Sequence, residues 1–300
     1  MKNIAFIINP TSGPKTKNRT SKLIRELLDK ERFSPTVVVT EYAGHATQLA
    51  QQFALEGYYA VIAVGGDGTV NEVASGLRGT DTALGIVPNG SGNGFARHLD
   101  ISTRMNRAVE MLNYSEVIKV DYCTVNDYPF FSTFGVGFDA VVAQDFSSTS
   151  RGVKGYIESI LKDIFQYKPE QYHLQGDGID IKTNAFLISF ANVSQWGNDA
   201  CIAPKASIQD GWIDIAILNE FPLIKVPELA WQLFTRNIDE NHYMHTIRTK
   251  EITLIRENTS SPVRIDGSPI QMGKELHIKI IEDGLKVLVK KKQEKIILKQ

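Results

Sequence analysis

An aspartate lies inside a glycine-rich turn that joins two segments of different periodicity. The turn is Val64-Gly65-Gly66-Asp67-Gly68-Thr69-Val70-Asn71-Glu72. It follows the apolar run 58–64, which is typical of a buried strand, and leads into 70–77, which has helical spacing. Glycine lets the backbone pass close to a ligand, and the first N–H groups of a helix attract phosphate. Because the aspartate would repel a phosphate unless a cation lay between them, the turn predicts a Mg-nucleotide site.

Two better-known nucleotide motifs are absent from the sequence. No Gly-x-x-x-x-Gly-Lys-Ser/Thr loop occurs, and the run Gly90-Ser91-Gly92-Asn93-Gly94 has the wrong spacing for a dinucleotide fingerprint. The alternative is a plain glycine turn with an Asx cap on the following helix. The neighbouring loops described below argue against that alternative.

Size and composition exclude several classes of protein. The 300 residues suffice for one large domain or two ordinary ones, and the hydrophobic content of 42% is that of a globular chain. A net charge of −1 argues against nucleic-acid binding. Cys123 and Cys201 fit buried apolar residues in a reducing compartment, which predicts a cytoplasmic protein. No segment is apolar enough to span a bilayer, so any membrane contact is expected to be peripheral.

The first 120 or so residues alternate strand-like and helix-like segments. Strands are predicted at 4–8, 36–40, 60–64 and 84–87, and helices at 20–30, 46–56 and 105–113. Continuous apolar strands separated by amphipathic helices indicate a parallel sheet covered on both faces. Such sheets bind ligands at the carboxyl ends of their strands. The four loops 9–13, 40–45, 65–69 and 88–94 are therefore expected to converge on one crevice.

Period-two alternation replaces this pattern after about residue 125. Leu276, Ile278 and Ile280 share a face, and Asp283-Gly284 is predicted to form a hairpin turn before a further strand. The segments 213–217 and 252–254 alternate in the same way. This half predicts an antiparallel β-sandwich with two inserted helices, at 154–167 and 225–237. The expected domains are residues 1–125 and 126–290. The lysine-rich run 290–295 fits a solvated strand end, with attraction to an anionic membrane as the alternative.

The order of these loops resembles the diacylglycerol kinase catalytic-domain family, in its soluble bacterial and sphingosine-kinase-like branch. The resemblance covers nearly the whole chain and is carried by three segments: Asn9-Pro10-Thr11-Ser12-Gly13, the aspartate turn with Asn71-Glu72, and Pro88-Asn89-Gly90-Ser91-Gly92-Asn93-Gly94-Phe95-Ala96-Arg97. The aspartate turn also resembles that of NAD kinases and phosphofructokinases. The resemblance implies an α/β N-terminal domain with a parallel sheet, followed by an antiparallel β-sandwich. It also implies that the tail 291–300 returns to the first domain.

The same resemblance implies ATP and Mg²⁺ as cofactors. The implied ATP contacts are Asn9, Pro10, Thr11, Ser12, Gly13, Thr40, Gly65, Gly66, Asp67, Gly68, Thr69, Val70, Asn71 and Ser91. Asp67 would hold Mg²⁺ or its water shell. Asp121 matches an aspartate that supports a water and Mg²⁺ network. Asp139 lies in a segment that resembles one with a substrate-facing aspartate, although its residues alone equally predict a strand end with a helix cap.

Two further aspartates are implied sites in the second half. Asp210 lies in a segment similar to one that holds a structural Mg²⁺, for which Ser207 and Trp212 would supply backbone carbonyls. From spacing alone, Asp210 would simply belong to a hairpin turn. Asp266 resembles the first residue of the family's Asp-Gly-Glu, which supplies a general base for the substrate hydroxyl.

The chain departs from the family pattern at two acidic positions. Ser268 replaces the glutamate of the Asp-Gly-Glu segment, and Gly94 replaces an aspartate common in the family. The second change moves the loop toward the form that sphingosine and ceramide kinases have. The loss of the glutamate keeps open a non-catalytic relative that binds nucleotide or lipid.

The predicted function is that of an ATP-dependent kinase for a lipid hydroxyl, either diacylglycerol or a sphingoid or ceramide-like lipid. An NAD kinase or another small-molecule kinase is the alternative enzyme. The expected partner is a lipid at the membrane surface and not a nucleic acid, and a homodimer is left open. The acyl chain would need an apolar groove, for which Phe130, Phe131, Phe134, Phe138 and the helix at 156–164 are candidates. Core packing explains those side chains equally well.

Overall fold

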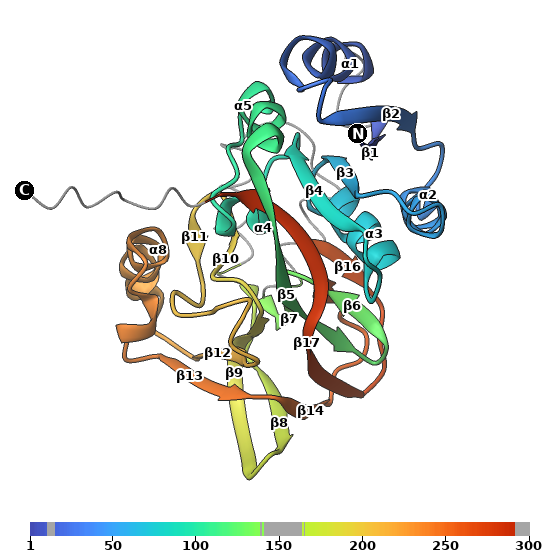
Figure 1. Ribbon diagram of the computed structural model, residues 1–300. Helices are drawn as coiled ribbons and strands as arrows, with labels where there is room; N and C mark the ends of the chain where they lie inside the picture. The colour runs from blue at the N-terminus through green and yellow to red at the C-terminus, as the bar shows by residue number, and fades with distance from the viewer. Residues whose placement is uncertain (11–15, 139, 141–163, 165, 292–300) are drawn as a thin grey trace, which may run out of the picture. The chain divides into compact units, whose positions relative to one another are not determined.

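The computed structural model describes residues 1–10, 16–138, 140, 164 and 166–291 (Figure 1). The chain divides into two compact units. Unit 1 contains Met1–Gly90, Leu99–Lys119 and Leu285–Gln300, and unit 2 contains Ser91–His98 and Val120–Gly284. The chain therefore leaves unit 1 after the fourth strand, returns to it, and enters it once more near the C-terminus.

Unit 1 is built on a parallel sheet, as the sequence predicted. Its strands are β1 (Lys2–Ile8), β2 (Phe33–Val39), β3 (Ala60–Gly65) and β4 (Ala83–Pro88), in the order β2-β1-β3-β4. All neighbouring pairs are parallel, with Ile8 opposite both Val39 and Val64. Every residue of β3 and β4 is buried, which explains why these strands are continuously apolar rather than alternating.

The helices of unit 1 lie close to the predicted positions. They are α1 (Thr16–Leu27), α2 (His45–Leu55), α3 (Asp67–Leu77), α5 (Met105–Met111) and the short η2 (Leu112–Tyr114). Helices α2 and α3 pack directly against each other, and Gly76 makes their close approach feasible. A Cβ at Gly76 would lie 2.6 Å from the carbonyl oxygen of Thr47 and 2.8 Å from the Cβ of Ala50.

Unit 2 is an antiparallel β-sandwich, again as predicted. Its strands are β6 (Tyr128–Phe130), β7 (Thr133–Gly137), β8 (Glu170–Gly176), β9 (Ile179–Ala191), β10 (Gln195–Gly197), β11 (Ala200–Cys201), β12 (Ile213–Asn219), β13 (Met244–Thr249), β14 (Glu251–Arg256), β15 (Val263–Ile265) and β16 (Ser268–Ile270). Strand β12 is buried on both faces: Ile215 enters one hydrophobic cluster and Ala216 the other. Strands β5 (Ser115–Val125) and β17 (Glu275–Lys290) each begin in one unit and end in the other.

The predicted hairpin at Asp283-Gly284 is wrong. Strand β17 runs without a turn from Glu275 to Lys290. Asp283 adopts a left-handed conformation (φ 54°) within the strand, and its N–H donates to the Asp121 carboxylate at 2.8 Å. A Cβ at Gly284 would lie 2.4 Å from the Tyr122 ring. The Asp-Gly pair therefore lets the strand pass the Tyr122 ring and does not reverse the chain.

The helices of unit 2 that lie wholly within the described residues are short. They are α4 (Gly94–His98), η3 (Leu223–Lys225), α8 (Val226–Thr235) and η4 (Ile238–Glu240). Helix α8 lies within the predicted segment 225–237, whereas nearly all of the helix predicted at 154–167, like the tail 292–300, lies outside the described residues. Among the described helices, none is both long and apolar enough to cross a membrane.

Candidate functional site

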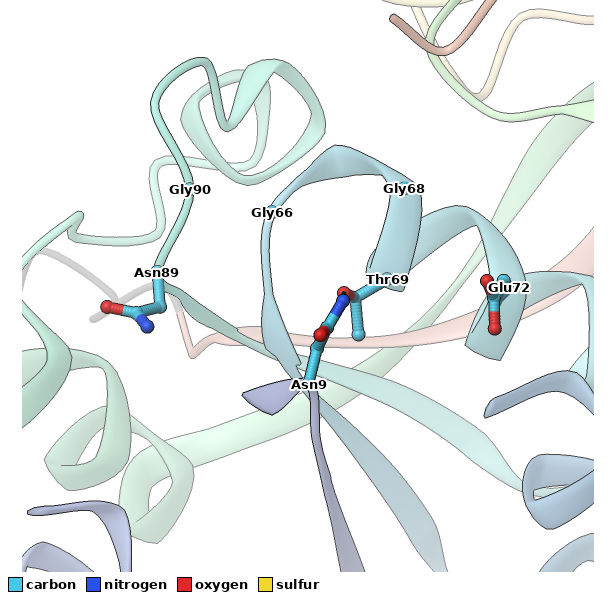
Figure 2. A pocket seen from close by; sticks show the side chains of 7 residues that line it. All are labelled: Asn9, Gly66, Gly68, Thr69, Glu72, Asn89 and Gly90. Atoms are coloured by element: carbon cyan, nitrogen blue, oxygen red, sulfur yellow. Dashed lines mark hydrogen bonds between the residues drawn. The ribbon is translucent and has the colours of Figure 1, made fainter. Parts of the chain in front are cut away.

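A cavity of about 310 Å³ lies at the carboxyl ends of the parallel strands of unit 1 (Figure 2). It is lined by Asn9, Gly66, Gly68, Thr69, Glu72, Asn89 and Gly90. These residues come from the loops after β1, β3 and β4 and from the first two turns of α3. Three of the four loops that the sequence singled out therefore meet at one cavity.

Hydrogen bonds hold the three loops together. The Asn9 side-chain amide donates to the Thr69 hydroxyl at 3.0 Å, and its backbone N–H donates to the carbonyl of Val64 at 3.1 Å. The backbone N–H of Asn89 donates to the carbonyl of Gly65 at 2.8 Å. In Figure 2 the Asn9 and Thr69 side chains point toward each other. The cavity wall is thus fixed by long-range contacts across the sheet.

Glycines bring the backbone close to the cavity. A Cβ at Gly66 would lie 3.2 Å from the Cα of Gly90, so the two loops touch through their main chains. Gly66 is the N-cap of α3 and supplies no capping side chain, and the first N–H groups of a helix have no partner within the helix itself. These groups and the helix dipole attract an anion. The residues present therefore fit the phosphates of a nucleotide.

The donor set also fits Mg²⁺ that arrives with a nucleotide. Asp67 is the first residue of α3 and is partly exposed, and Glu72 lines the cavity one turn further along the helix. Among the described residues, no cluster of three or more His, Cys, Asp or Glu side chains is arranged to hold a metal. Mg²⁺ commonly takes one or two carboxylates and completes its shell with phosphate and water. Asp67 and Glu72 would supply those carboxylates.

Thr40, an implied ATP contact, is not among the residues that line the cavity. It is 8% exposed, and its N–H donates to the carbonyl of Ile8 at 3.0 Å. The first turn of α2, which follows the loop that begins at Thr40, is connected to the cavity through Glu72. The Glu72 carboxylate accepts from the N–H of Ala46 at 3.2 Å, and its carbonyl accepts from the hydroxyl of Thr47 at 2.9 Å.

Other implied ATP contacts are placed in different surroundings. Val70 is buried in the core, and the Asn71 amide oxygen accepts a hydrogen bond from Ser75 at 3.5 Å. Ser91 is exposed, belongs to unit 2, and does not line the cavity. Pro10 is exposed, and Thr11, Ser12 and Gly13 lie outside the described residues.

The implied ATP contacts did not include Glu72, Asn89 and Gly90, although Asn89 and Gly90 belong to the loop 88–94 that was expected at the crevice. The signal for all three was present, because Glu72 ends the Gly-Gly-Asp-Gly-Thr-x-Asn-Glu run and the other two follow β4. Helical spacing places Glu72 three residues after Thr69, on the same side of α3.

The Asp121 carboxylate joins two segments of unit 2. Asp121 is 3% exposed, and its carboxylate oxygens accept from the N–H of Gly211 at 2.9 Å and of Asp283 at 2.8 Å. Its own N–H donates to the carbonyl of Ile208 at 2.7 Å. These contacts give Asp121 a structural role. The predicted Mg²⁺ and water network around it stays a prediction, as does the role of Asp139, which lies outside the described residues.

Asp210 forms an ion pair with an arginine. Arg248 contacts its carboxylate directly and reaches the carboxylate of Asp214 at 3.4 Å. Asp210 also accepts from the N–H of Trp212 at 3.2 Å, which closes an Asx turn. The Ser207 hydroxyl accepts from the N–H of Gln209 at 3.4 Å. A structural Mg²⁺ at Asp210 would have to compete with Arg248, and that site stays a prediction.

Burial raises the pKa of Asp214, which lies beside this ion pair. Its side chain is only 2% exposed, so the charged form loses hydration. Arg248 opposes the shift by attraction, and the neighbouring negative charge of Asp210 adds to it.

Asp266 is bound by three backbone N–H groups. Its carboxylate accepts from Phe131 at 2.9 Å, Ser132 at 2.8 Å and Thr133 at 3.1 Å. The residue is 5% exposed and has a left-handed backbone (φ 43°) at the turn before Ser268. Because both carboxylate oxygens already accept hydrogen bonds, this geometry favours a structural role. The general-base assignment stays a prediction.

The departure at Gly94 has a packing cause. A Cβ at Gly94 would lie 3.1 Å from the carbonyl oxygen of Trp196 and 3.2 Å from that of Gln195. Nearby, a Cβ at Gly197 would meet the Cα of Gly92 at 2.9 Å. The glycine-rich loop therefore packs main chain to main chain on β10, and an aspartate at position 94 would require that contact to open.

Comparisons with known proteins agree with this architecture. The model of the diacylglycerol kinase catalytic domain matches residues 3–125, and that of the YegS C-terminal NAD kinase beta sandwich-like domain matches residues 132–289. The chain is 28% identical over 255 residues to "Diacylglycerol kinase" of Bacillus subtilis (strain 168), covering 82% of this chain and 84% of the relative. It is 26% identical over 283 residues to "Probable lipid kinase YegS" of Escherichia coli O127:H6 (strain E2348/69 / EPEC), covering 92% and 93%.

A solved structure has the same fold. The crystal structure of a diacylglycerol kinase from Bacillus anthracis str. Sterne superposes with a TM-score of 0.75 at 21% identity, covering 96% of this chain and 97% of that chain. The two family models together extend over nearly the whole sequence, in the order that the two halves of the chain follow. The chain therefore belongs to the diacylglycerol kinase catalytic-domain family of lipid kinases, with a YegS-type C-terminal domain.

Proposed function

We propose that this protein transfers the terminal phosphate of ATP to the hydroxyl group of a lipid. The observation that carries the proposal is the cavity at the N-terminus of α3, which glycine main chain and the Glu72 side chain line, with Asp67 beside it as the first residue of the helix. Membership of a kinase family supports ATP as the phosphate donor. The printed name of the Bacillus subtilis relative supports a diacylglycerol-like acceptor.

Phosphoryl transfer requires positioning and neutralisation of charge more than covalent catalysis. The N–H groups at the start of α3 would bind phosphate oxygens, and the Asn9–Thr69 hydrogen bond holds the turn in place. Gly66 and Gly90 keep side chains away from the phosphates. Mg²⁺, when bound with the nucleotide at Asp67 and Glu72, supplies charge neutralisation.

The acceptor hydroxyl also needs a group that takes its proton. Asp266 and Asp67 are the two carboxylates proposed for catalysis. Asp67 is partly exposed at the cavity turn, whereas Asp266 is buried and bound by backbone N–H groups. The contrast in exposure makes Asp67 the stronger candidate for direct contact with the reacting groups.

The four phenylalanines considered for the acyl groove are buried in unit 2. Phe130 and Phe134 are fully buried in one cluster, and Phe138 packs in the other. Phe131 is only 1% exposed. The structure therefore favours the core-packing alternative for these residues. We retain diacylglycerol and sphingoid or ceramide-like lipids as the acceptor classes to be tested.

The test is a kinase assay with purified protein, labelled ATP, Mg²⁺ and a panel of diacylglycerol, sphingosine, ceramide and NAD. We expect one lipid class to be phosphorylated, and Asp67→Asn to lower kcat at least about 10²-fold. Normal turnover by Asp67→Asn would show that phosphoryl transfer does not take place at this turn. Phosphorylation of NAD alone would establish the small-molecule kinase instead. Stable ATP binding without any product would establish the non-catalytic alternative that Ser268 keeps open.

A further inference from the structure

The chain makes a detour into unit 2 directly after the cavity. Asn89 and Gly90 line the cavity and belong to unit 1, whereas residues 91–98 belong to unit 2, and the chain returns to unit 1 at Leu99. We call residues 91–98 the connecting segment. Because this segment is covalently joined to Gly90, whatever fixes it within unit 2 restricts the positions that Gly90 can take at the cavity.

The detour is longer than the fold of unit 1 needs. Strand β4 ends at Pro88, and α5, the next helix of unit 1, begins at Met105. Connections between a strand and a helix in α/β units usually have about 2–6 residues, and much longer ones are commonly functional. The excess length is spent on contacts between the connecting segment and residues 194–201, which contain β10 and β11. In Figure 1, α4 of the connecting segment lies beside β10.

Gly92 is held by the main chain of the β10–β11 hairpin. Its carbonyl accepts from the N–H of Asn198 at 3.3 Å. A Cβ at Gly197 would lie 2.9 Å from the Cα of Gly92 and 3.0 Å from its carbonyl carbon. Gly197 has φ 125°, a conformation that glycine adopts readily and other residues rarely do. The two glycines therefore touch through their backbones, two positions along the chain from Gly90.

Side chains tie the rest of the connecting segment to the same hairpin. The guanidinium of Arg97 donates through Nε to the carbonyl of Gly92 at 3.2 Å and through Nη1 to the Asp199 carboxylate at 2.8 Å. At the end of the segment, Nδ1 of His98 accepts from the N–H of Ser194 at 3.3 Å and lies 3.1 Å from the Ser194 hydroxyl. Residues 194–199 therefore hold the connecting segment near both of its ends.

The hairpin is itself fixed to the sandwich of unit 2. Gln195 is 1% exposed, and its side-chain oxygen accepts from the N–H of Asp199 at 3.2 Å. The Trp196 indole N–H donates at 3.2 Å to the hydroxyl of Ser189, a fully buried residue of β9. Strand β9 pairs with β7, β8 and β12. The connecting segment is therefore attached to a part of unit 2 that is anchored in its sheet.

We infer that the β10–β11 hairpin positions the nucleotide site, with Gly197 and Asp199 acting through the connecting segment to hold Gly90 at the cavity. The inference rests on the proposed function, because ATP phosphates are the ligand proposed for that cavity. Binding groups must be placed to within about 1 Å to act well on a ligand. Neither Gly197 nor Asp199 lines the cavity, so both are positioning residues, and their effect on the nucleotide passes through the chain at Gly90.

The experiment titrates the full chain with ATP and Mg²⁺ by calorimetry, without lipid. The test variant is Gly197→Ala, whose methyl group would press on Gly92. The matched control is Gly178→Ala, which also has a positive φ (75°) but whose Cβ meets nothing within 4 Å. We expect Kd for ATP to rise at least about fivefold in Gly197→Ala and to change less than about twofold in the control. A purely structural role would instead lower the number of ATP sites per chain and leave Kd unchanged.

A second substitution perturbs the same contact more gently. Asp199→Asn weakens the ion pair with Arg97 at a carboxylate that is 56% exposed, so the fold is expected to survive. We expect Kd for ATP to rise about threefold, and Asp199→Glu, which keeps the charge, to stay within about twofold of the wild type. The matched control is Glu257→Gln, which weakens the exposed Lys274–Glu257 pair of 3.1 Å and should leave Kd unchanged.

The outcomes separate this inference from the proposed function. Wild-type Kd in both Gly197→Ala and Asp199→Asn, or fewer sites with an unchanged Kd, would overturn the inference even if the wild type phosphorylates a lipid. Weaker ATP binding in both variants, with no lipid phosphorylated by the wild type, would support the inference and refute only the kinase activity. A wild type that binds no ATP would overturn both.

Discussion

The side-chain amide of Asn9 donates a hydrogen bond to the hydroxyl of Thr69 at 3.0 Å, joining residues that are sixty positions apart. The contact links the loop after β1 to the first turn of α3 across the cavity. Thr69 is 5% exposed, so its hydroxyl serves this internal bond. The Gly-Gly-Asp-Gly-Thr turn therefore depends on the first loop of the chain for its shape.

Replacement of this hydroxyl should weaken ATP binding more than turnover. Thr69→Val keeps the size of the side chain and removes the acceptor for Asn9. A buried hydrogen bond of this kind contributes about 1 kcal/mol, so we expect KM for ATP to rise about fivefold with kcat changed less than about threefold. Thr36→Val is the control. The Thr36 hydroxyl forms a hydrogen bond of 3.1 Å with the Tyr58 hydroxyl, and neither residue lines the cavity. An unchanged KM would show that the bond does not shape the site.

A methyl group at Gly66 should block the phosphate site without straining the backbone. Gly66 has φ −92° and ψ −169°, which alanine also adopts, but its Cβ would lie 3.2 Å from the Cα of Gly90. Gly66→Ala is therefore expected to fold and to bind ATP at least about tenfold more weakly by calorimetry. Gly273→Ala, whose Cβ meets nothing within 4 Å, is the control. Wild-type affinity in Gly66→Ala would place the phosphates elsewhere.

Asp266→Asn separates a structural role from a catalytic one. In the wild type, three backbone N–H groups donate to the two carboxylate oxygens of Asp266. Asparagine has only one acceptor oxygen for these donors, so we expect the free energy of unfolding to fall by about 2 kcal/mol or more. Thermal unfolding measures this loss. A general base would give the opposite pattern, with an unchanged midpoint and a kcat lowered about 10²- to 10⁴-fold. Asp67→Asn, at a partly exposed position, is expected to show that catalytic pattern.

Competition between Arg248 and Mg²⁺ tests the implied metal site at Asp210. Arg248 contacts the Asp210 carboxylate, so a bound cation must displace it. We predict that Mg²⁺ raises the unfolding midpoint of the wild type, that Asp210→Asn abolishes the rise, and that Arg248→Gln increases it. An identical Mg²⁺ effect in Asp210→Asn would mean that the metal binds at another position.

Asp214 should make stability depend on pH in a defined direction. Burial raises its pKa above the ordinary value of 3.8, with Asp210 adding to the shift and Arg248 and Lys205 opposing it. The folded state therefore binds the proton more readily than the unfolded chain, and stability falls as pH rises from 3.8 through the folded pKa. As pH rises through that window, the unfolding free energy of the wild type is expected to fall relative to that of Asp214→Asn. Parallel pH profiles would contradict this.

Local pattern was enough to predict the scaffold of unit 1 and the position of its cavity. Continuous apolar strands, such as 60–64, can only be buried on both faces, and helices between them require parallel pairing. The turn at Asp67 could be recognised because glycine spacing and the start of a helix are both encoded within a few residues.

Only the tertiary structure decided the roles of the acidic residues and the outward face of α8. Asp283-Gly284 has the signature of a hairpin, yet the Asp283 N–H donates to Asp121, 162 residues away, and the strand continues to Lys290. The Asp266 carboxylate is held by N–H groups 133 to 135 residues away. In α8, apolar residues cover more of the surface of the helix than the core needs, and packing alone selects Leu229 for the core and leaves Trp231 outside. Long-range contacts, which no local pattern encodes, settle which of several compatible roles a side chain takes.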